Sequence, residues 1–195
     1  IHLLTGTYHV IDPLFGRGQC PVELDLGCGK GGFALALAER YPESLVVAAD
    51  LMLGRLRKAQ RQVDRRDLHN VELLRASSLE LVSYQLPPHS IDRMHLLCPD
   101  PWPKNRHRNK RLVTSEFLGR VARVIKPGGI VHFASDHIDY VVAFKNIADR
   151  LCFLEAAPDG IGDVADIHTD FELRWRSQGK HVPHLSYRTV VSSRQ

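Results

Sequence analysis

The sequence predicts an α/β protein built on a doubly wound, mainly parallel β-sheet with helices on both faces. The alternation of two kinds of segment along the chain carries this prediction. Short runs rich in Val, Leu and Ile alternate with longer segments of helical periodicity, and strands that alternate with helices need right-handed crossovers, which make neighbouring strands parallel. The chain has 195 residues, of which 44% are hydrophobic and 25% charged, and this suits one domain over residues 1–195.

The individual elements follow from periodicity and turn residues. Residues 1–21 are rich in Gly, Pro and His and are expected to form an irregular lead-in. Lys126-Pro127-Gly128-Gly129 is expected to stop a helix and turn into a strand. The expected strands are 22–26, 45–49, 71–76, 91–98, 130–134, 153–156 and 185–191; the expected helices are 33–40, 53–67, 115–125 and 138–151, with a short helical or turn segment at 78–84 and a polar loop at 158–170.

Composition excludes several classes of protein. No segment reaches the roughly 18 consecutive apolar residues of a membrane span, and the first residues lack the pattern of a signal peptide. We therefore expect a soluble, cytoplasmic protein without membrane contact. Cys20, Cys28, Cys98 and Cys152 form no Cys-x-x-Cys pair, so we expect small buried apolar residues and neither a disulfide nor a metal site. The net charge of +4 is compatible with a polyanionic partner but does not establish one.

A ligand site is expected where the first two strands end, because ligands of open α/β sheets bind beyond the carboxyl ends of the strands. Gly27, Gly29 and Gly31 let the backbone turn tightly and let a ligand approach without a Cβ in the way. Asp50 ends the second strand and is placed to accept hydrogen bonds from two ribose hydroxyls. This Rossmann-like spacing alone fits both NAD and S-adenosylmethionine.

An acidic residue beside the turn favours S-adenosylmethionine. Asp25 would repel the pyrophosphate of a dinucleotide, whereas it attracts the ammonium or sulfonium group of S-adenosylmethionine. Asp25 and Asp50 together form an acidic lining that suits a cationic ligand. A glycine turn that only packs a helix on a strand accounts for neither carboxylate.

The segment after the fourth strand carries most of the substrate information. Pro99, Pro101 and Pro103 forbid a helix or a central strand, so the chain is held stiffly beyond the strand end. Asp100 supplies a carboxylate and Trp102 a flat apolar face. A cationic run follows, formed by Lys104, Arg106, Arg108, Lys110 and Arg111. An acceptor for base N–H groups, a ring for stacking and cations for phosphates suit a nucleotide in a polyanionic chain.

Taken alone, these features have plainer explanations. A cationic run is more often a solvated surface, and a tryptophan is more often a core residue. Their attachment to the proline-locked Asp100 at the ligand-binding edge favours the functional interpretation.

Several segments resemble a known family. Residues 23–31, Glu-Leu-Asp-Leu-Gly-Cys-Gly-Lys-Gly, resemble the first motif of class I methyltransferases, and residues 126–129 resemble the turn before their fifth strand. Residues 99–111, Pro-Asp-Pro-Trp-Pro-Lys-x-Arg-His-x-x-Lys-Arg, resemble the signature of the bacterial tRNA (guanine-N7-)-methyltransferases, the TrmB family. Ser135-Asp136 and residues 169–172 fit the same family, so the resemblance covers about residues 22–180.

The resemblance implies the class I methyltransferase fold, S-adenosylmethionine as the methyl donor, and tRNA as the partner, methylated at N7 of a guanosine in the variable loop. It does not decide between monomer and homodimer. Donor contacts are expected at Asp25, Gly27, Gly29, Gly31, Asp50, Ser77 and Asp100, with Asp100 also the catalytic carboxylate. Substrate contacts are expected at Lys104, Arg106, Arg108, Arg111, Asp136, Thr169, Asp170, Phe171 and Glu172.

One departure from the family lies after the third strand. The family usually has an acid there to hold the adenine amino group, whereas this chain has Ser77, which only partly replaces that acceptor.

Two alternatives remain open at this point. Amino-methyltransferases acting on adenine or cytosine place Asn/Asp-Pro-Pro-aromatic at the same strand end, although here the aromatic residue is third and the basic run is extra. The second alternative is a protein that binds the methyl donor and RNA but does not catalyse transfer. Ser77 in place of the family's acid is compatible with this alternative.

Overall fold

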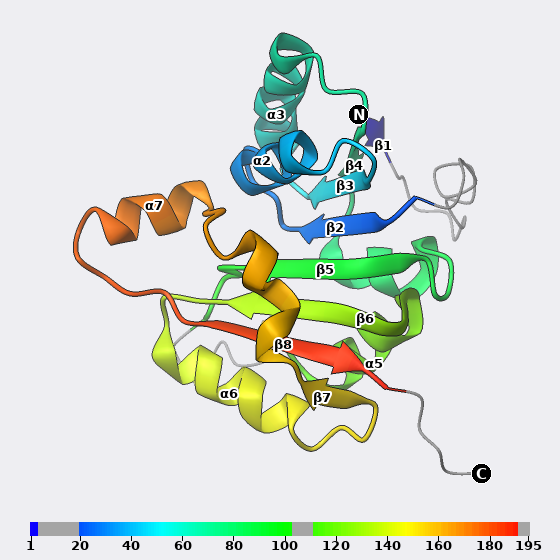
Figure 1. The fold of residues 1–195 in the computed structure, drawn as a ribbon, viewed down its shortest axis with the longest axis vertical. Helices are drawn as coiled ribbons and strands as arrows, with labels where there is room; N and C mark the ends of the chain where they lie inside the picture. Colours follow the sequence, from blue (N-terminus) through cyan, green and yellow to red (C-terminus); the bar gives the residue numbers. More distant parts are fainter. Residues whose placement is uncertain (4–19, 103–110, 191–195) are drawn as a thin grey trace.

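The strands form one sheet in which six neighbouring strands are parallel, so that their carboxyl ends lie along a common edge. The computed structural model describes residues 1–3, 20–102 and 111–190. Within these residues the sheet has eight strands in the order β1-β4-β3-β2-β5-β6-β8-β7 (Figure 1). The strands are β1 (His2–Leu3), β2 (Val22–Leu26), β3 (Leu45–Asp50), β4 (Val71–Arg75), β5 (Ile91–Leu97), β6 (Ile125–Ala134), β7 (Leu154–Ala156) and β8 (His184–Thr189). All neighbours pair in parallel except β8, which is antiparallel to β6 and β7.

Helices cover both faces of this sheet, as the sequence predicts. The elements α2, α3 and η3 pack on one face, which is turned toward the viewer in Figure 1, and η1, α5 and α6 pack on the other. The helical elements are α2 (Gly32–Arg40), α3 (Leu53–Arg66), α4 (Ser78–Glu80), η1 (Leu81–Gln85), α5 (Ser115–Val124), α6 (Ile138–Ala148), η3 (Pro158–Val164) and α7 (Asp170–Arg176).

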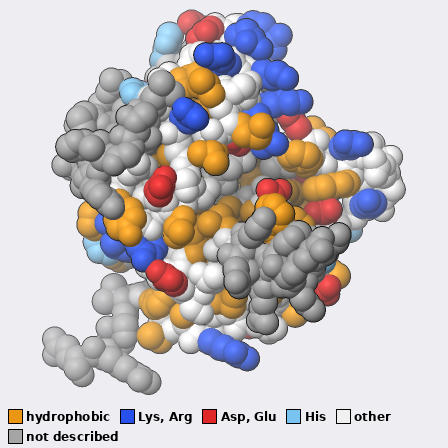
Figure 2. Space-filling view, turned by 180° about the vertical axis from the view of Figure 1, so that it is seen from behind, with side chains coloured by type: hydrophobic (Ala, Val, Ile, Leu, Met, Phe, Trp, Pro, Cys, Tyr) orange, Lys and Arg blue, Asp and Glu red, His pale blue; other side chains and the backbone are white. Residues whose placement is uncertain are grey.

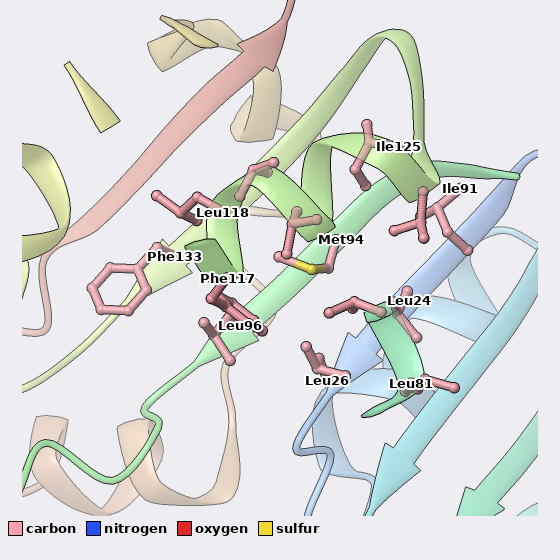
Figure 3. Packing of buried hydrophobic residues seen from close by; sticks show 14 of the residues in the cluster. Leu24, Leu26, Leu81, Ile91, Met94, Leu96, Phe117, Leu118, Ile125 and Phe133 are labelled. Carbon is pink, nitrogen blue, oxygen red and sulfur yellow. The ribbon is translucent and has the colours of Figure 1, made fainter. Parts of the chain in front are cut away.

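Alternating strand residues supply two separate cores. On β5, Met94 and Leu96 join the core beneath α5, while Leu97 joins the core beneath α2, since successive side chains of a strand point to opposite faces. Figure 3 shows the first of these cores, with side chains from β2, β5 and α5 in contact. Burial of this apolar surface on both faces fixes the register of the central strands.

Two segments that were expected to be irregular, residues 1–21 and residues 158–170, contain regular structure. His2 and Leu3 form β1, a parallel edge strand beside β4, so the lead-in over 1–21 is not wholly irregular; its residues 4–19 lie outside the described ranges. The expected polar loop at 158–170 contains η3, which buries Ile161 and Val164 against the core beneath α2. The sequence looks polar there because so short a helix needs few buried positions.

The turn at residues 126–129 falls inside a strand. Ile91 pairs with Ile125 and Arg93 with Ile130, so four residues of β6 lie outside the ladder between these pairs. Gly128 has a left-handed φ of 81°, which favours glycine. The helix stop before this segment occurs as predicted, because α5 ends at Val124.

The cysteines differ from expectation in their burial. All four are free thiols, and Cys20, Cys28 and Cys98 are only partly buried while Cys152 is exposed. Cys28 and Cys98 follow β2 and β5 at the ligand-binding edge, where packing is incomplete. The described helices include none with the length and apolar character needed to cross a membrane.

We expect Gly129→Ala and Gly119→Ala to change stability in opposite directions. A Cβ at Gly129 would lie 2.6 Å from the Asp92 carbonyl oxygen and 2.7 Å from Ile125 Cγ2, and such overpacking costs about 1–3 kcal/mol. Gly119 lies inside α5, where a Cβ meets nothing within 4 Å, so alanine should stabilise the helix by up to about 1 kcal/mol. Urea unfolding of both variants measures the two changes, and an unchanged stability of Gly129→Ala would contradict this account of residues 126–129.

Candidate functional site

The carboxyl ends of the parallel strands define the candidate site. On one side of β2 lie β3 and β4, and on the other lie β5 and β6, so the direction of strand succession reverses between β2 and β5. Ligand crevices form at such a switch point, beyond the carboxyl ends of the strands. Asp25, Asp50, Ser77, Asp100 and Asp136 all lie at or just after strand ends along this edge, which is the edge to which the arrowheads of β2, β3 and β5 point in Figure 1.

The glycine turn after β2 leaves open space above its first half. Gly27, Gly29 and Gly31 have left-handed φ angles of 89°, 60° and 85°, which favour glycine. A Cβ at Gly27 or Gly29 would meet no atom within 4 Å. A Cβ at Gly31 would lie 3.0 Å from the Ala59 Cβ atom, so Gly31 permits close packing of α2 on α3. The turn therefore has two functions, and only Gly27 and Gly29 border open space.

The Asp50 carboxylate holds this turn in place. Asp50 is buried, and its Oδ2 accepts a hydrogen bond from the Gly29 N–H at 3.0 Å while its Oδ1 accepts one from the Met52 N–H at 2.7 Å. The Arg55 guanidinium lies 3.7 Å from Oδ2. Each carboxylate oxygen has further lone pairs, so Asp50 fixes the turn and keeps acceptor capacity for ligand hydroxyls.

Asp25 is the unsatisfied acid of the site. It is 3% exposed, and its Oδ2 has no hydrogen-bond partner among the described residues. Burial, and then the nearby charge of Asp50, raise the pKa of Asp25 to about 7. Buried polar atoms without a partner are rare in folded proteins. A cationic or N–H-bearing ligand at this edge would satisfy the oxygen that the protein leaves without a partner.

Exposed apolar side chains border the same edge beyond β3 and β4. Leu51, Met52 and Leu79 are 63%, 54% and 46% exposed, which is unusual for three large apolar residues so close to strand ends. Ser77 precedes α4, and its hydroxyl makes no capping hydrogen bond. These residues suit the apolar face of a purine ring, with the Ser77 hydroxyl as the available polar group.

The Asp100 segment is strained where it leaves β5. Cys98 and Trp102 have left-handed φ angles of 53° and 40°, and such angles cost about 1–3 kcal/mol for residues other than glycine. The Cys98 N–H donates to the Ala134 carbonyl at 2.8 Å, and Arg111 Nε donates to the Trp102 carbonyl at 3.2 Å. These anchors hold an exposed Asp100 between them. Lys104, Arg106 and Arg108 lie outside the described residues.

Tyr140 supports this segment from α6 and was not identified from the sequence. Its hydroxyl accepts a hydrogen bond from the Val113 N–H at 3.2 Å. Burial, with a smaller contribution from the charge of Asp100, raises the pKa of Tyr140. The spacing of apolar residues in α6 identifies Tyr140 as a buried position, but only the tertiary structure shows that its hydroxyl meets the chain beyond Asp100.

Residues 169–172 approach the glycine turn from a distant part of the chain. The Thr169 hydroxyl caps α7 by accepting a hydrogen bond from the Glu172 N–H at 3.1 Å. Asp170 lies so close to the turn that a Cβ at Gly32 would be 2.6 Å from its Oδ1 atom. Phe171 is 49% exposed and stacks on Trp175, with ring centroids 5.8 Å apart.

Cys98 marks the point where the predicted substrate residues converge. Burial, and then the charges of Asp136 and Glu172, raise the pKa of Cys98 to about 12, while a hydrogen bond with Thr169 opposes the increase. These effects require all three residues to lie near the end of β5. The structure thus brings Asp136, Thr169 and Glu172 together beside the strand that leads to Asp100.

Glu172 is the most buried of these acids, with 1% of its surface exposed. Its Oε1 accepts hydrogen bonds from Arg176 Nε at 2.9 Å and His184 Nε2 at 3.1 Å, and His168 Nδ1 lies 3.1 Å away. Burial raises the pKa of Glu172, but the hydrogen bonds from His184 and Arg176 outweigh it and lower the pKa overall. The sequence identifies Glu172 but not these partners. No cluster of His, Cys, Asp and Glu suited to hold a metal ion occurs among the described residues.

Comparison with known proteins agrees with this geometry. The family described as "Putative methyltransferase" matches residues 19–185. A tRNA (guanine-N(7)-)-methyltransferase of Geobacter metallireducens is 30% identical over 185 residues, which are 91% of this chain and 86% of that protein. The enzymes with the same name from Corynebacterium diphtheriae and Corynebacterium jeikeium are 34% and 31% identical, and they cover 81% and 86% of this chain. The chain spans 63% and 60% of the lengths of these two relatives.

Solved structures support the fold. The 16S rRNA methyltransferase KamB superposes with a TM-score of 0.66 at 22% identity and covers 92% of both chains. The aminoglycoside resistance methyltransferase NpmB1 gives a TM-score of 0.62, also at 22% identity and with 92% of both chains covered. The sheet order, the glycine turn and these similarities agree with one another. The chain belongs to the tRNA (guanine-N7-)-methyltransferase family and has the class I methyltransferase fold.

Proposed function

We propose that this chain transfers a methyl group from S-adenosylmethionine to N7 of a guanosine in the variable loop of tRNA, in the cytoplasm. The observation that carries the proposal is the pairing of two features on neighbouring strands. The open glycine turn with the unsatisfied Asp25 follows β2, and the strained Asp100 segment follows β5, which pairs with β2. A donor site and an acceptor site thus lie side by side.

The donor site fits S-adenosylmethionine by its chemistry. When bound, this molecule supplies an electrophilic methyl group on a sulfonium centre. Asp25 Oδ2 offers a buried negative acceptor for its cationic groups, and Asp50 offers lone pairs for its ribose. Leu51, Met52 and Leu79 offer apolar contact to adenine, where Ser77 stands in place of the family's acid.

The acceptor site fits a base that becomes positive. Guanine N7 has an in-plane lone pair, so no base has to remove a proton before transfer, and alignment is the main requirement. Positive charge then develops on the purine, and carboxylates near its N1 and N2 edge bind it better as the methyl moves. Asp100 is exposed and rigidly held at this point, with Asp136 and Glu172 close to the same strand end.

A cationic surface on α3 suits the phosphates of the RNA. Arg57, Lys58 and Arg61 are exposed, and no carboxylate of the described residues forms an ion pair with them. Elsewhere, Arg120, Lys145 and Arg188 are each paired with a carboxylate. Figure 2 shows Lys and Arg side chains gathered at the end of the molecule that contains α3. Cations without local partners are available to replace phosphate counterions.

Asp100→Asn should retain donor and tRNA binding but lose methyl transfer by about two orders of magnitude or more, because a preorganised charge that acts mainly in the transition state is removed. Radiolabelled donor, unmodified tRNA and borohydride–aniline cleavage at the product base measure rate and position together. Asp159→Asn, an exposed acid on η3, is the matched control. Full activity of Asp100→Asn would remove the assigned role, and exocyclic methylation would indicate an amino-methyltransferase.

Donor affinity should fall as the pH is lowered through the pKa of Asp25. With that pKa near 7, the carboxylate is mostly ionised at pH 8 and mostly protonated at pH 6. A cationic ligand prefers the ionised form, so the dissociation constant should rise by about tenfold between these values. Calorimetric titration of S-adenosylmethionine checks this, and Asp25→Asn should abolish the pH dependence. A profile that stays steep in Asp25→Asn would assign the titration to another group.

The triple variant Arg57→Ala, Lys58→Ala and Arg61→Ala should bind tRNA more weakly and with a smaller salt dependence. Removing one cation that touches a phosphate lowers the slope of log K against log salt concentration by about 0.9. Donor binding should not change. The control removes Arg120, Lys145 and Arg188, which are already paired with carboxylates, and its salt slope should equal that of the unmodified protein. Equal slopes for both triple variants would show that α3 does not contact the RNA.

A further inference from the structure

A buried row of hydrogen-bonded side chains crosses four strands on the face covered by α2 and η3. From the substrate edge inward, Glu172 Oε1 meets His184 Nε2 at 3.1 Å, and His184 Nδ1 meets His132 Nε2 at 2.8 Å. His132 Nδ1 then meets His95 Nδ1 at 2.9 Å, and His95 Nε2 meets Glu23 Oε2 at 2.9 Å. The row extends from α7 through β8, β6 and β5 to β2 (Figure 1).

Both ends of this row are ionised. At the inner end, Arg93 donates two hydrogen bonds of 2.9 Å to Glu23 and one of 2.7 Å to Asp163. Burial raises the pKa of Glu23, but His95 and Arg93 outweigh it and lower the pKa overall. At the outer end, Arg176 and His168 also face Glu172, whose pKa is lowered. Two carboxylates that only accept hydrogen bonds therefore bound the row.

The protons along the row exceed what neutral rings can supply. The row contains two carboxylates and three imidazoles, so there are four gaps between neighbouring groups. Each gap needs one proton to form a hydrogen bond. A neutral imidazole carries one ring N–H, so three neutral rings supply three protons. Filling all four gaps requires one proton more than neutrality provides.

We propose that His95, His132 and His184 hold one excess proton between Glu23 and Glu172, and that this proton relay positions the Glu172 carboxylate at the substrate edge. The role of Glu172 in substrate binding rests on the proposed function, whereas the proton count does not. His184 and His132 are positioning residues in this scheme, since they act through Glu172.

The excess proton resides on His184. Burial lowers the pKa of His95, although Glu23 opposes this, and burial together with the charges of His95, His184 and Arg93 lowers the pKa of His132 further. Phe33 packs on both of these rings, with centroid distances of 4.7 and 6.4 Å. His184 has 18% of its side chain exposed and faces the Glu172 carboxylate directly. Of the three histidines, His184 is therefore the one on which a positive charge loses the least favourable contact with water.

The proton can also move inward without breaking the row. His184 Nδ1 passes its proton to His132 Nε2, and His132 Nδ1 passes its own to His95 Nδ1. His184 and His132 are then neutral and His95 is doubly protonated, so the number of protons is unchanged and all four gaps stay filled. The charge beside Glu172 can thus decrease when a cationic base approaches, and the counter-charge then lies beside Glu23.

Nitrogen-15 NMR of the free protein, with labelled histidine, tests the count at pH 7. Protonated and unprotonated ring nitrogens have well separated shifts. We expect four N–H groups among the six ring nitrogens of these histidines, with His95 Nδ1 and His132 Nε2 unprotonated. In Glu172→Gln the amide can donate to His184, so the count should fall to three. His69→Gln, at a side chain 84% exposed, is the control. Three N–H groups in the unmodified protein would overturn the proposal.

Kinetics test the positioning role. In the unmodified protein, KM for tRNA should rise with pH as the excess proton is lost, with kcat affected less. His132→Phe keeps an aromatic ring beside Phe33 but removes the acceptor of His184, so the proton is lost at a lower pH and KM at pH 7 should rise by about tenfold. A rise in KM without a shifted pH profile would show a packing role only. If the protein methylates no tRNA but the NMR count is four, the relay stands and the proposed function fails.

Discussion

Four carboxylates, Glu23, Asp25, Asp50 and Glu172, lie on or beside the sheet with 6% or less of their surfaces exposed. An isolated buried carboxylate is too costly to stay ionised, so each must find a cation, hydrogen-bond donors, a proton or a ligand. The rest of the structure depends on how each is satisfied. Glu23 has Arg93 and His95, Asp50 has the N–H groups of Gly29 and Met52, and Glu172 has Arg176 and His184. Of the four, Asp25 alone has a fully buried oxygen without a hydrogen-bond partner among the described residues, and it lies where the turn is open.

The sequence is sufficient to predict the sheet, because hydrophobic periodicity reports on local burial. For residues 22–156 the bounds of most predicted strands and helices lie close to those in the structure. The prediction also places Asp25 and Asp50 at strand ends. It fails for η3 and α7, whose short helices have too few buried positions to show a period. The prediction of a buried Cys152 is wrong for a related reason, since residue type alone does not reveal packing.

The site could be predicted from the sequence only where its functional residues lie together in one segment of the chain. The prolines around Asp100 indicate a stiff acidic loop, but the left-handed Cys98 and Trp102 that complete it follow from tertiary contacts. His95, His132 and His184 are distant in sequence, and each alone looks like a core or loop residue. They form a row only because β5, β6 and β8 are adjacent and their register brings alternate side chains to one face.

The row depends on β8 running antiparallel to its two neighbours in the sheet. A parallel β8 would present its first residue at the opposite edge, whereas the antiparallel pairing sets His184 beside Ala134, at the carboxyl end of β6. His184 thereby reaches both His132 on the sheet and Glu172 on α7. The strand direction thus determines which edge receives the imidazole, and it is the edge with Asp100, Asp136 and Thr169. The arrangement that completes the sheet thus also gives the deeply buried Glu172 its hydrogen bond with His184.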